Sequence, residues 1–260
     1  IKKYTTEQME AQLDKVDEAV MPVDADNNSD LEITDEEGNV LVRFADGHIK
    51  TKHFNSAATS HSMLQGKSMN VIGDSYVKNH QQSESLTWHS LIAQENGMTY
   101  RNYGINGNGL VANATGSPVL SRYSAMDNNA DIVVVVGGKN DYNQQISISS
   151  FKTGLATLCE GLVSKYATKA KICFFTPWCI AKTPSDDPQT IKLTEYVDAI
   201  KEVCGLHSIP VFDSSRDGGV YMWSETFRAK YCQSSSDVSH LNSDGHKNFK
   251  NKAFNFINSL

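Results

Sequence analysis

From Ser68 to the C-terminus, short apolar runs alternate with longer segments in which apolar residues recur every three or four positions. Short runs rich in β-branched residues predict strands, and the longer periodic segments predict helices. Alternation of the two is typical of a parallel sheet with helices on both faces. The sequence therefore predicts a doubly wound α/β fold with strands at Met69–Ile72, Met98–Tyr103, Asp131–Val136, Ile172–Phe175 and Ile209–Phe212.

Two of the expected helices have clear apolar stripes. One stripe consists of Leu155, Leu158, Cys159, Leu162 and Tyr166, and the other of Leu193, Tyr196, Val197, Ile200 and Val203. Each stripe has the 3.6-residue period of a helix that packs on a sheet. In folds of this kind, ligands bind at the carboxyl ends of the strands, so the loops that follow the strands are the first place to look for function.

Residues 1–67 have a different pattern and are predicted to form an extension to the main domain, residues 68–260. Met9, Leu13, Val16 and Val20 have helical spacing, and the alternating runs 31–34, 40–44 and 48–54 predict a small β meander. Residues 56–67 resemble a linker. His48, His53 and His61 lack the spacing of metal ligands, so no metal is predicted.

Composition limits the classes of partner. The 260 residues carry a net charge of -6, which gives no basic surface for nucleic acid or an anionic membrane. The longest apolar run, Ile132–Val136, is too short to span a membrane. The five cysteines are an odd number without a Cys-x-x-Cys pair, so buried thiols are favoured over a zinc site or a disulfide framework.

Four loops carry residues that could act in catalysis. They are Gly73-Asp74-Ser75, Asn102–Gly109, Gly137–Asp141 and Asp237–His246. Taken singly, each resembles an ordinary turn. The first is not a Gly-x-Ser-x-Gly elbow, because residue 77 is Val. The glycines of the second fit neither the dinucleotide fingerprint nor a phosphate loop, which leaves close backbone approach to a ligand.

Two of these loops suggest acyl-transfer chemistry. Asp237 lies three residues before His240, so its carboxylate can bind one imidazole nitrogen and leave the other free as a base. Asn140 follows the most apolar strand and could donate its side-chain amide to an oxyanion. The alternative for each is a structural role, as a helix cap, a turn or a surface histidine.

Together, in this order, the four loops resemble the motifs of the SGNH, or GDSL-type, hydrolase family. The resemblance covers Ser68–Leu260 and implies a three-layer α/β/α sandwich with a mainly parallel five-stranded sheet. It also implies a serine esterase that needs no cofactor, with Ser75 as nucleophile, His240 as base and Asp237 as its partner. The oxyanion hole would consist of the backbone amides of Ser75 and Gly107 and the side chain of Asn140; Gly107 is chosen over Gly104 as the block's second glycine.

Two positions depart from the family's commonest pattern: Lys139 stands where Thr is common, and Leu241 where Pro is frequent. Neither removes a group that the reaction needs. Lys139 could favour acidic substrates; the alternative is a solvated side chain. No long apolar lid segment is evident, which favours a short acyl group such as acetyl. Trp178, Tyr221 and Trp223 follow later strands and could stack on a sugar, which favours an ester of a carbohydrate, or they could instead pack the loops. The alternatives are a lipase, lysophospholipase or thioesterase for longer acyl chains, or a non-catalytic attachment module.

The N-terminal extension resembles segments that precede esterase domains in gut Bacteroidales. The resemblance rests on residues 33–41 and 47–52. A meander with an amphipathic helix favours attachment or self-assembly over catalysis. The chain begins at Ile1, not Met, as expected for a processed or trimmed N-terminus. We expect a secreted or periplasmic location, with any signal outside this sequence.

Overall fold

The computed structural model describes residues 62–113, 116–166, 168–181 and 192–260, together with three strands nearer the N-terminus. These strands are β1 (Leu31–Thr34), β2 (Val40–Ala45) and β3 (His48–Lys50), which pair antiparallel in the order β1-β2-β3, as expected for a meander. The helix predicted around residues 9–20 lies outside the described residues.

The chain divides into two compact units, Ile1–His61 and Ser62–Leu260. The sequence assigns residues 62–67 to a linker, but they pack on the second unit. The Leu64 side chain is 2% exposed, and the Gly66 amide donates to the Asn96 carbonyl at 2.9 Å. The second unit therefore begins six residues before Ser68, where the first strand of its sheet starts.

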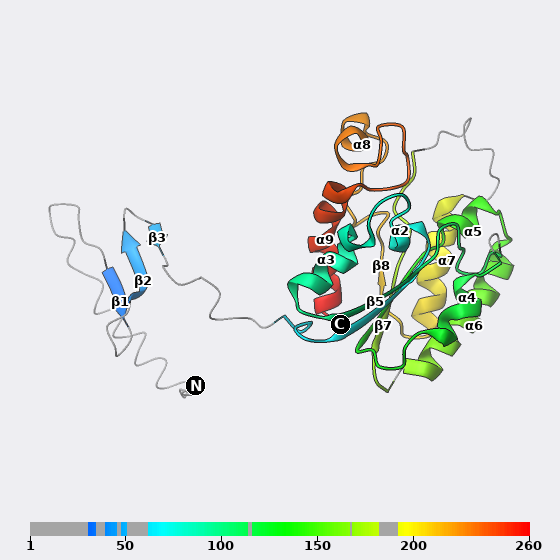
Figure 1. The fold of residues 1–260 in the computed structure, drawn as a ribbon, viewed down its shortest axis with the longest axis horizontal. Coiled ribbons are helices and arrows are strands. Elements are labelled where there is room, and N and C mark those ends of the chain that lie inside the picture. The colour runs from blue at the N-terminus through cyan, green and yellow to red at the C-terminus, as the bar shows by residue number, and fades with distance from the viewer. Residues whose placement is uncertain are drawn as a thin grey trace. The chain divides into compact units, whose positions relative to one another are not determined.

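A five-stranded parallel sheet forms the centre of the second unit (Figure 1). Its order is β5-β4-β6-β7-β8, and the strands are β4 (Ser68–Gly73), β5 (Thr99–Gly104), β6 (Ile132–Val136), β7 (Lys171–Phe175) and β8 (Val211–Phe212). This arrangement confirms the predicted fold. The first of these strands, β4, lies between β5 and β6, so the direction of strand addition reverses there. Such a switch point opens a crevice at the carboxyl ends of the strands.

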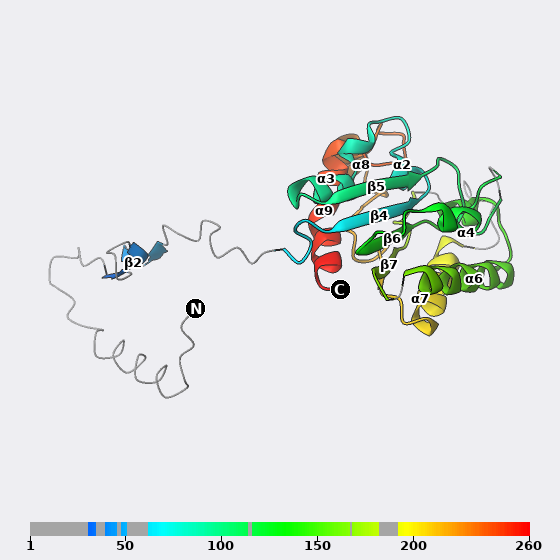
Figure 2. The ribbon, with the colours of Figure 1, turned by 60° about the horizontal axis from the view of Figure 1, so that its bottom comes forward.

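Helices cover both faces of the sheet (Figure 2). One face carries α3 (Trp88–Glu95) and α9 (Ser243–Asn258), and the other carries α6 (Ile148–Tyr166) and α7 (Leu193–Leu206). All five residues of the first predicted stripe are buried on α6. The remaining helical elements are short: α2 (Ser75–Lys78), η1 (Glu84–Leu86), α4 (Val119–Arg122), η2 (Tyr123–Ala125), α5 (Lys139–Asn143) and α8 (Glu225–Tyr231).

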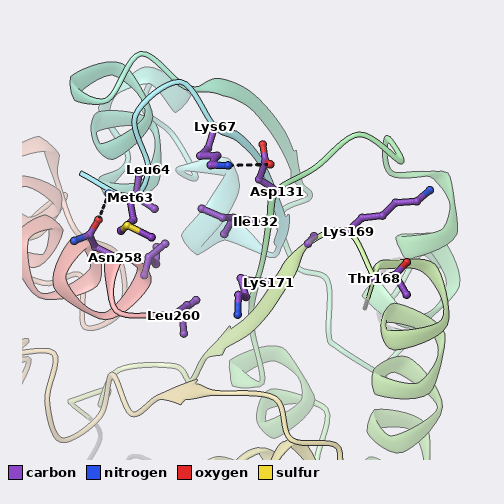
Figure 3. A pocket seen from close by; sticks show the side chains of 12 residues that line it. Met63, Leu64, Lys67, Asp131, Ile132, Thr168, Lys169, Lys171, Asn258 and Leu260 are labelled. Atoms are coloured by element: carbon purple, nitrogen blue, oxygen red, sulfur yellow. Dashed lines mark hydrogen bonds and ion pairs between the residues drawn. The ribbon is translucent and has the colours of Figure 1, made fainter. Parts of the chain in front are cut away.

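The amino edge of the sheet has a cavity of about 390 Å³ (Figure 3). Lys67 and Asp131, which precede β4 and β6, form an ion pair there with Nζ and Oδ1 3.6 Å apart. Both side chains are more than 40% exposed, so solvent screens the pair. On the other side of the cavity, the Met63 amide donates to Asn258 Oδ1 at 2.8 Å. Both contacts are structural: each joins two neighbouring segments of the fold.

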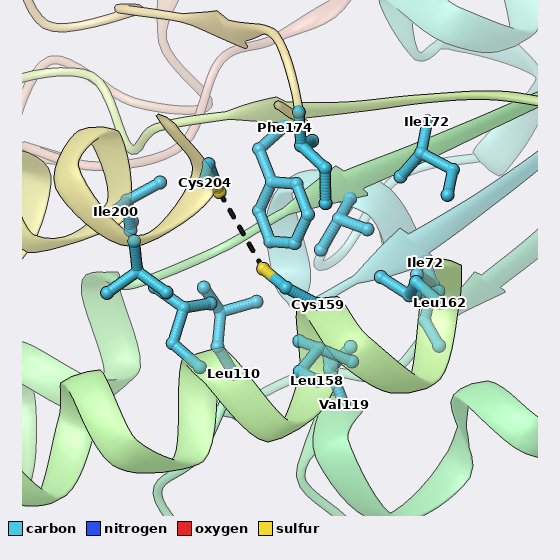
Figure 4. Packing of buried hydrophobic residues seen from close by; sticks show 14 of the residues in the cluster. Ile72, Leu110, Val119, Leu158, Cys159, Leu162, Ile172, Phe174, Ile200 and Cys204 are labelled. Atoms are coloured by element: carbon cyan, nitrogen blue, oxygen red, sulfur yellow. Dashed lines mark hydrogen bonds between the residues drawn. The ribbon is translucent and has the colours of Figure 1, made fainter. Parts of the chain in front are cut away.

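The two core layers follow from the alternation of side chains along the strands. On β4, Ile72 packs with α6 and α7, while Met69 and Val71 pack with α3 and α9. Cys159 of α6 and Cys204 of α7 lie in the first layer with their sulfurs 4.0 Å apart (Figure 4). All five cysteines are free thiols, and four are buried, as the sequence indicates.

Candidate active site

Ser75 lies at the carboxyl end of β4, where the strand turns into α2. The backbone at Gly73 lies so close to β6 that a Cβ there would be 2.3 Å from the Val136 carbonyl oxygen. Only glycine fits at this position. Asp74 caps α2, with its carboxylate accepting the Tyr76 amide at 2.9 Å. Arg122 donates to the Gly73 carbonyl at 2.6 Å. The Ser75 side chain is thus fixed above the switch point of the sheet.

His240 and Asp237 meet Ser75 in a chain of hydrogen bonds. His240 Nε2 lies 3.0 Å from Ser75 Oγ, and His240 Nδ1 lies 3.1 Å from Asp237 Oδ2. The other carboxylate oxygen of Asp237 accepts the amides of Ser239 and His240, each at 2.8 Å. The structure therefore brings together the hydroxyl, imidazole and carboxylate that the sequence singled out. Three residues of separation suffice because the turn folds the carboxylate back onto its own loop.

The Asp237 carboxylate is ionised at neutral pH. Burial by itself would raise its pKa, but hydrogen bonds from the His240 ring and from the amides of His240 and Ser239 outweigh burial and lower the pKa to about 2. An ionised carboxylate accepts only, so it holds the proton of His240 on Nδ1. The opposite nitrogen, Nε2, then faces Ser75 as a proton acceptor.

Aromatic side chains surround the His240 ring. Tyr76 meets it edge-on, at 78° with ring centroids 6.0 Å apart, and Tyr76 stacks in turn on Trp178 at 4.0 Å. The Trp178 indole Nε1 donates to the Ser239 carbonyl at 2.8 Å, and the Tyr76 hydroxyl lies 3.1 Å from Ser239 Oγ. These contacts tie the His240 loop to the first turn of α2.

Asn140 lies in α5, directly after β6, on the other side of the switch point. Its Nδ2 donates to the Asn108 carbonyl at 2.9 Å and to Asp74 Oδ2 at 3.2 Å, and its Oδ1 accepts from Asn143 at 3.2 Å. A bound oxyanion would take over one of the two Nδ2 hydrogens. Asn140 is therefore oriented by residues on either side of Ser75.

Gly107 lies in the loop after β5, next to Asn108, and has a φ of 78°, where a side chain is strained. The end of this loop is held by Asp141, whose carboxylate accepts the amides of Leu110, Val111 and Ala112 at 2.7 to 2.9 Å. Because Asn108 also accepts from Asn140, Gly107 and Asn140 belong to one connected network.

Asp74 is an ionisable group buried beneath the site. Burial raises its pKa to about 6, although the Tyr76 amide, Lys139 and His240 each favour the ionised form. The effect of Lys139 on Asp74 places its positive charge near the site. Lys139 is half-buried, at the start of α5.

The three aromatic residues predicted as substrate contacts differ in position. Trp178 is 1% exposed, between Tyr76 and Phe249, and has no exposed ring face to offer a ligand. Tyr221 and Trp223 are 66% and 58% exposed. Trp223 also lines a cavity of about 230 Å³ beside Tyr142 of α5. Of the three, only the exposed pair can present a ring to a sugar.

Several residues of the site were missed in the sequence. Asp74, Tyr76, His80, Arg122 and Asp141 contact or support the functional groups, yet none was predicted to do so. Asp74 and Asp141 lie inside predicted motifs, which is a signal that could have found them. No sequence signal points to His80 or Arg122. Within the residues that the structure describes, no group of three or more metal-ligating side chains occurs, and no helix there could cross a membrane.

Solved structures share the fold. A protein from Lactobacillus plantarum superposes with a TM-score of 0.66 at 23% identity, over 75% of this chain and 98% of that one. The acetylxylan esterase Axe2 from Geobacillus stearothermophilus gives 0.56 at 16% identity, over 75% and 96%. LAE5, an alpha/beta hydrolase enzyme from the metagenome of Lake Arreo, gives 0.54 at 18% identity, also over 75% and 96%.

No curated protein matches the sequence. Residues 71–247, more than half of the chain, match the model of the GDSL-like lipase/acylhydrolase family. This span contains all three residues of the Ser75, His240 and Asp237 chain. The protein belongs to the GDSL-like lipase/acylhydrolase family and is a carboxylic-ester hydrolase.

Proposed function

We propose that the protein hydrolyses short acyl esters, above all acetyl esters of carbohydrates, with Ser75 as nucleophile, His240 as general base and Asp237 as the partner of His240. The observation that carries this proposal is the unbroken contact from Ser75 Oγ to His240 Nε2, at 3.0 Å, and from His240 Nδ1 to Asp237 Oδ2, at 3.1 Å. Both lie within the range of a catalytic hydrogen bond.

In the first half of the reaction, His240 Nε2 takes the hydroxyl proton of Ser75 while Oγ bonds to the ester carbonyl carbon. The carbonyl π electrons move onto oxygen and form a tetrahedral oxyanion. When they return, the bond to the alcohol oxygen breaks, and His240 gives its proton to that oxygen. The products are an acyl-Ser75 enzyme and a free alcohol.

In the second half, water replaces the alcohol. His240 takes a proton from water, whose oxygen bonds to the acyl carbon, and then returns that proton to Ser75 Oγ as the acid leaves. The oxyanion forms twice and needs donors each time. We assign this role to the Ser75 and Gly107 amides and to Asn140 Nδ2, because Asn140 and the Gly107 loop are linked through Asn108 beside Ser75.

Small substrate size is supported by the lack of an enclosed cavity beside the nucleophile in the described part of the chain. The recess lined by Ser75, Tyr76 and His240 has about 140 Å³ of empty space and no room for a water molecule. Pockets that enclose drug-sized ligands usually have roughly 300 to 1,000 Å³. The described residues form no such pocket at Ser75, which favours a short acyl group over a long acyl chain. The name of the structural neighbour Axe2, an acetylxylan esterase, agrees with this choice of substrate.

A sugar ring as the alcohol part is supported by the exposed aromatic side chains Tyr221 and Trp223. Carbohydrates present flat C–H faces that pack on aromatic rings, and the indole of Trp223 borders a cavity of about 230 Å³. Lys139 adds positive charge near the site, which would favour acidic sugars.

The decisive variant is Ser75→Ala, which removes the attacking oxygen and leaves the fold intact. We expect hydrolysis of 4-nitrophenyl acetate to fall by at least about 1,000-fold, and labelling by a fluorophosphonate probe to disappear. Circular dichroism checks that the variant is folded. Full activity in the purified variant would disprove the assignment of Ser75, and an unlabelled, inactive wild-type protein would instead indicate a non-catalytic module.

Substrate class is tested separately on the wild-type protein. We expect acetate release from O-acetylated oligosaccharides, and rates on 4-nitrophenyl esters that fall as the acyl chain lengthens from acetyl to decanoyl. The matched variant Trp223→Ala should raise KM for the oligosaccharide and leave 4-nitrophenyl acetate unchanged. Faster hydrolysis of the decanoyl ester would indicate a lipase or thioesterase.

A further inference from the structure

His80 contacts the ring of His240, although it is not part of the chain from Ser75 to Asp237. The two imidazole rings are stacked, with centroids 4.4 Å apart and an angle of 12° between their planes. His240 therefore has one face covered by His80, while its two nitrogens face Ser75 and Asp237. Stacked contacts of this kind restrict rotation of a ring about its side-chain bonds.

The backbone at His80 is in an unusual conformation. Asn79 has a φ of 71° and His80 a φ of 42°, both in the left-handed region. Residues other than glycine rarely adopt it, and such positions cluster at functional sites. Glycine would adopt both conformations without strain. A histidine at such a position therefore calls for a role of its side chain.

The loop that presents His80 is anchored from within the protein. Asn79 is 2% exposed; its Oδ1 lies 3.1 Å from Nε2 of the buried His246, and its Nδ2 donates to the Ser83 carbonyl at 2.5 Å. His246 in turn accepts the Trp88 amide at 3.4 Å. The neighbour of His80 is thus fixed on both sides, which fixes the backbone from which the His80 side chain extends.

We propose that His80 is a positioning residue, which holds the imidazole of His240 in the plane that directs Nε2 at Ser75 and, while uncharged, allows His240 to become charged during the reaction. This inference rests on the proposed function and deepens it. His240 carries a positive charge in both halves of the reaction, and a second positive charge 4.4 Å away would oppose it.

The groups around His80 favour its uncharged form. Burial and then the neighbouring His240 lower the pKa of His80, and Lys139 of α5 acts in the same direction. Asp237 opposes them. Asp74 and His246 also interact electrostatically with His240. At neutral pH His80 is therefore an uncharged stacking partner, and acid converts it into a repelling one.

The test uses two substitutions at His80 in the full-length chain. His80→Gly removes the ring at a φ that glycine tolerates, so a loss of activity cannot be assigned to backbone strain. His80→Phe keeps a flat ring but cannot be protonated. Gln81→Ala, at the exposed neighbouring position of the same loop, is the matched control.

At pH 8 we expect His80→Gly to lower kcat and the rate of fluorophosphonate labelling by about tenfold with KM unchanged, because the reacting atoms are less well aligned. His80→Phe and Gln81→Ala should stay within about twofold of the wild type. In mild acid, kcat/KM of the wild type should fall further than that of His80→Phe, because only the wild type gains a positive charge at residue 80.

Four results would overturn the inference: wild-type kcat and labelling in His80→Gly, an equal loss in His80→Phe, an equal loss in Gln81→Ala, or the same loss of kcat/KM in acid for His80→Phe and the wild type. The Ser75→Ala variant separates this failure from that of the proposed function. If Ser75→Ala retains activity, the proposed function fails; if it is inactive while His80→Gly is unchanged, only the role of His80 fails.

Discussion

The two edges of the central sheet differ in what they hold. At the amino edge, a cavity of about 390 Å³ is bordered by the exposed ion pair of Lys67 and Asp131. At the carboxyl edge, the recess at Ser75 has no room for a water molecule, but a hydroxyl, an imidazole and a carboxylate meet there in hydrogen-bond contact. The size of a cavity therefore does not locate the chemistry of this protein; the convergence of partly buried polar groups does.

The difference has a structural cause. Charged groups at the amino edge reach solvent and pair weakly. At the carboxyl edge, Asp74 is buried and has its pKa raised to about 6, whereas Asp237, with three hydrogen bonds, has its pKa lowered to about 2. Carboxylates whose environments move their pKa values in opposite directions are typical of catalytic sites.

After Ser75→Ala, the strongest test of this contrast is an Asp→Asn substitution made once at the carboxyl edge and once at the amino edge. Asp237→Asn keeps an oxygen for the amides of Ser239 and His240, but its Nδ2 would face His240 Nδ1. His240 would then carry its proton on Nε2 and could not accept one from Ser75. We expect kcat for 4-nitrophenyl acetate to fall by roughly 10,000-fold.

The control is Asp131→Asn, in which the carboxylate that accepts the Ser68 amide at 2.7 Å is changed at the amino edge. It should leave kcat unchanged and lower thermal stability slightly. Equal losses of activity in the two variants would show that the two edges do not differ as described.

A smaller effect is expected at Asn140, the proposed oxyanion donor. Asn140→Ala removes the amide and should lower kcat by about 100- to 1,000-fold with little change in KM, because the donor acts on the transition state. Asn143→Ala removes only the group that donates to Asn140 Oδ1, at 3.2 Å, and should cost less than about tenfold. A raised KM with an unchanged kcat in Asn140→Ala would contradict the assigned role.

The smallest effect concerns the stability of the carboxyl edge in acid. Burial, followed by the nearby His240, lowers the pKa of His246 from 6.5 to about 3. Between these values the unfolded chain binds a proton that the folded protein does not, so stability falls as pH falls. His246→Gln cannot titrate, and its stability relative to the wild type should improve by about 2 kcal/mol between pH 7 and pH 5.

This effect is measured by urea denaturation of both proteins at the two pH values. The difference between the two proteins cancels the contribution of every other titrating group. An unchanged difference would mean that folding does not lower the pKa of His246, and the hydrogen bond from the Trp88 amide to His246 Nδ1 would then need another explanation.

The loops of the site were identified in the sequence because strand ends in a parallel sheet gather at one edge. Ser75 and Asn140 each follow a β-branched or apolar strand, and the run Ile132–Val136 is buried along its whole length. Asp237 and His240 are close in the chain, so a local turn suffices to pair them. These features need only short-range geometry and the order of the elements.

Other features could not be found that way. Trp178 was assigned to substrate because it follows a strand, but its ring is buried against Tyr76. The linker expected up to residue 67 ends earlier, since Leu64 is buried in the second unit. Both outcomes depend on how loops fold over one another, and the pattern of a single segment carries no information about that.

By itself, the sequence determined the layered α/β fold and pointed to the candidate reacting groups, because apolar periodicity and the position of loops after strands are local properties of the chain. The tertiary structure alone decided that His80 covers His240, that Asp74 orients Asn140, and that the roomier cavity lies away from Ser75. These contacts join residues far apart in the chain, and their energies arise only when packing removes the groups from water and fixes their distances.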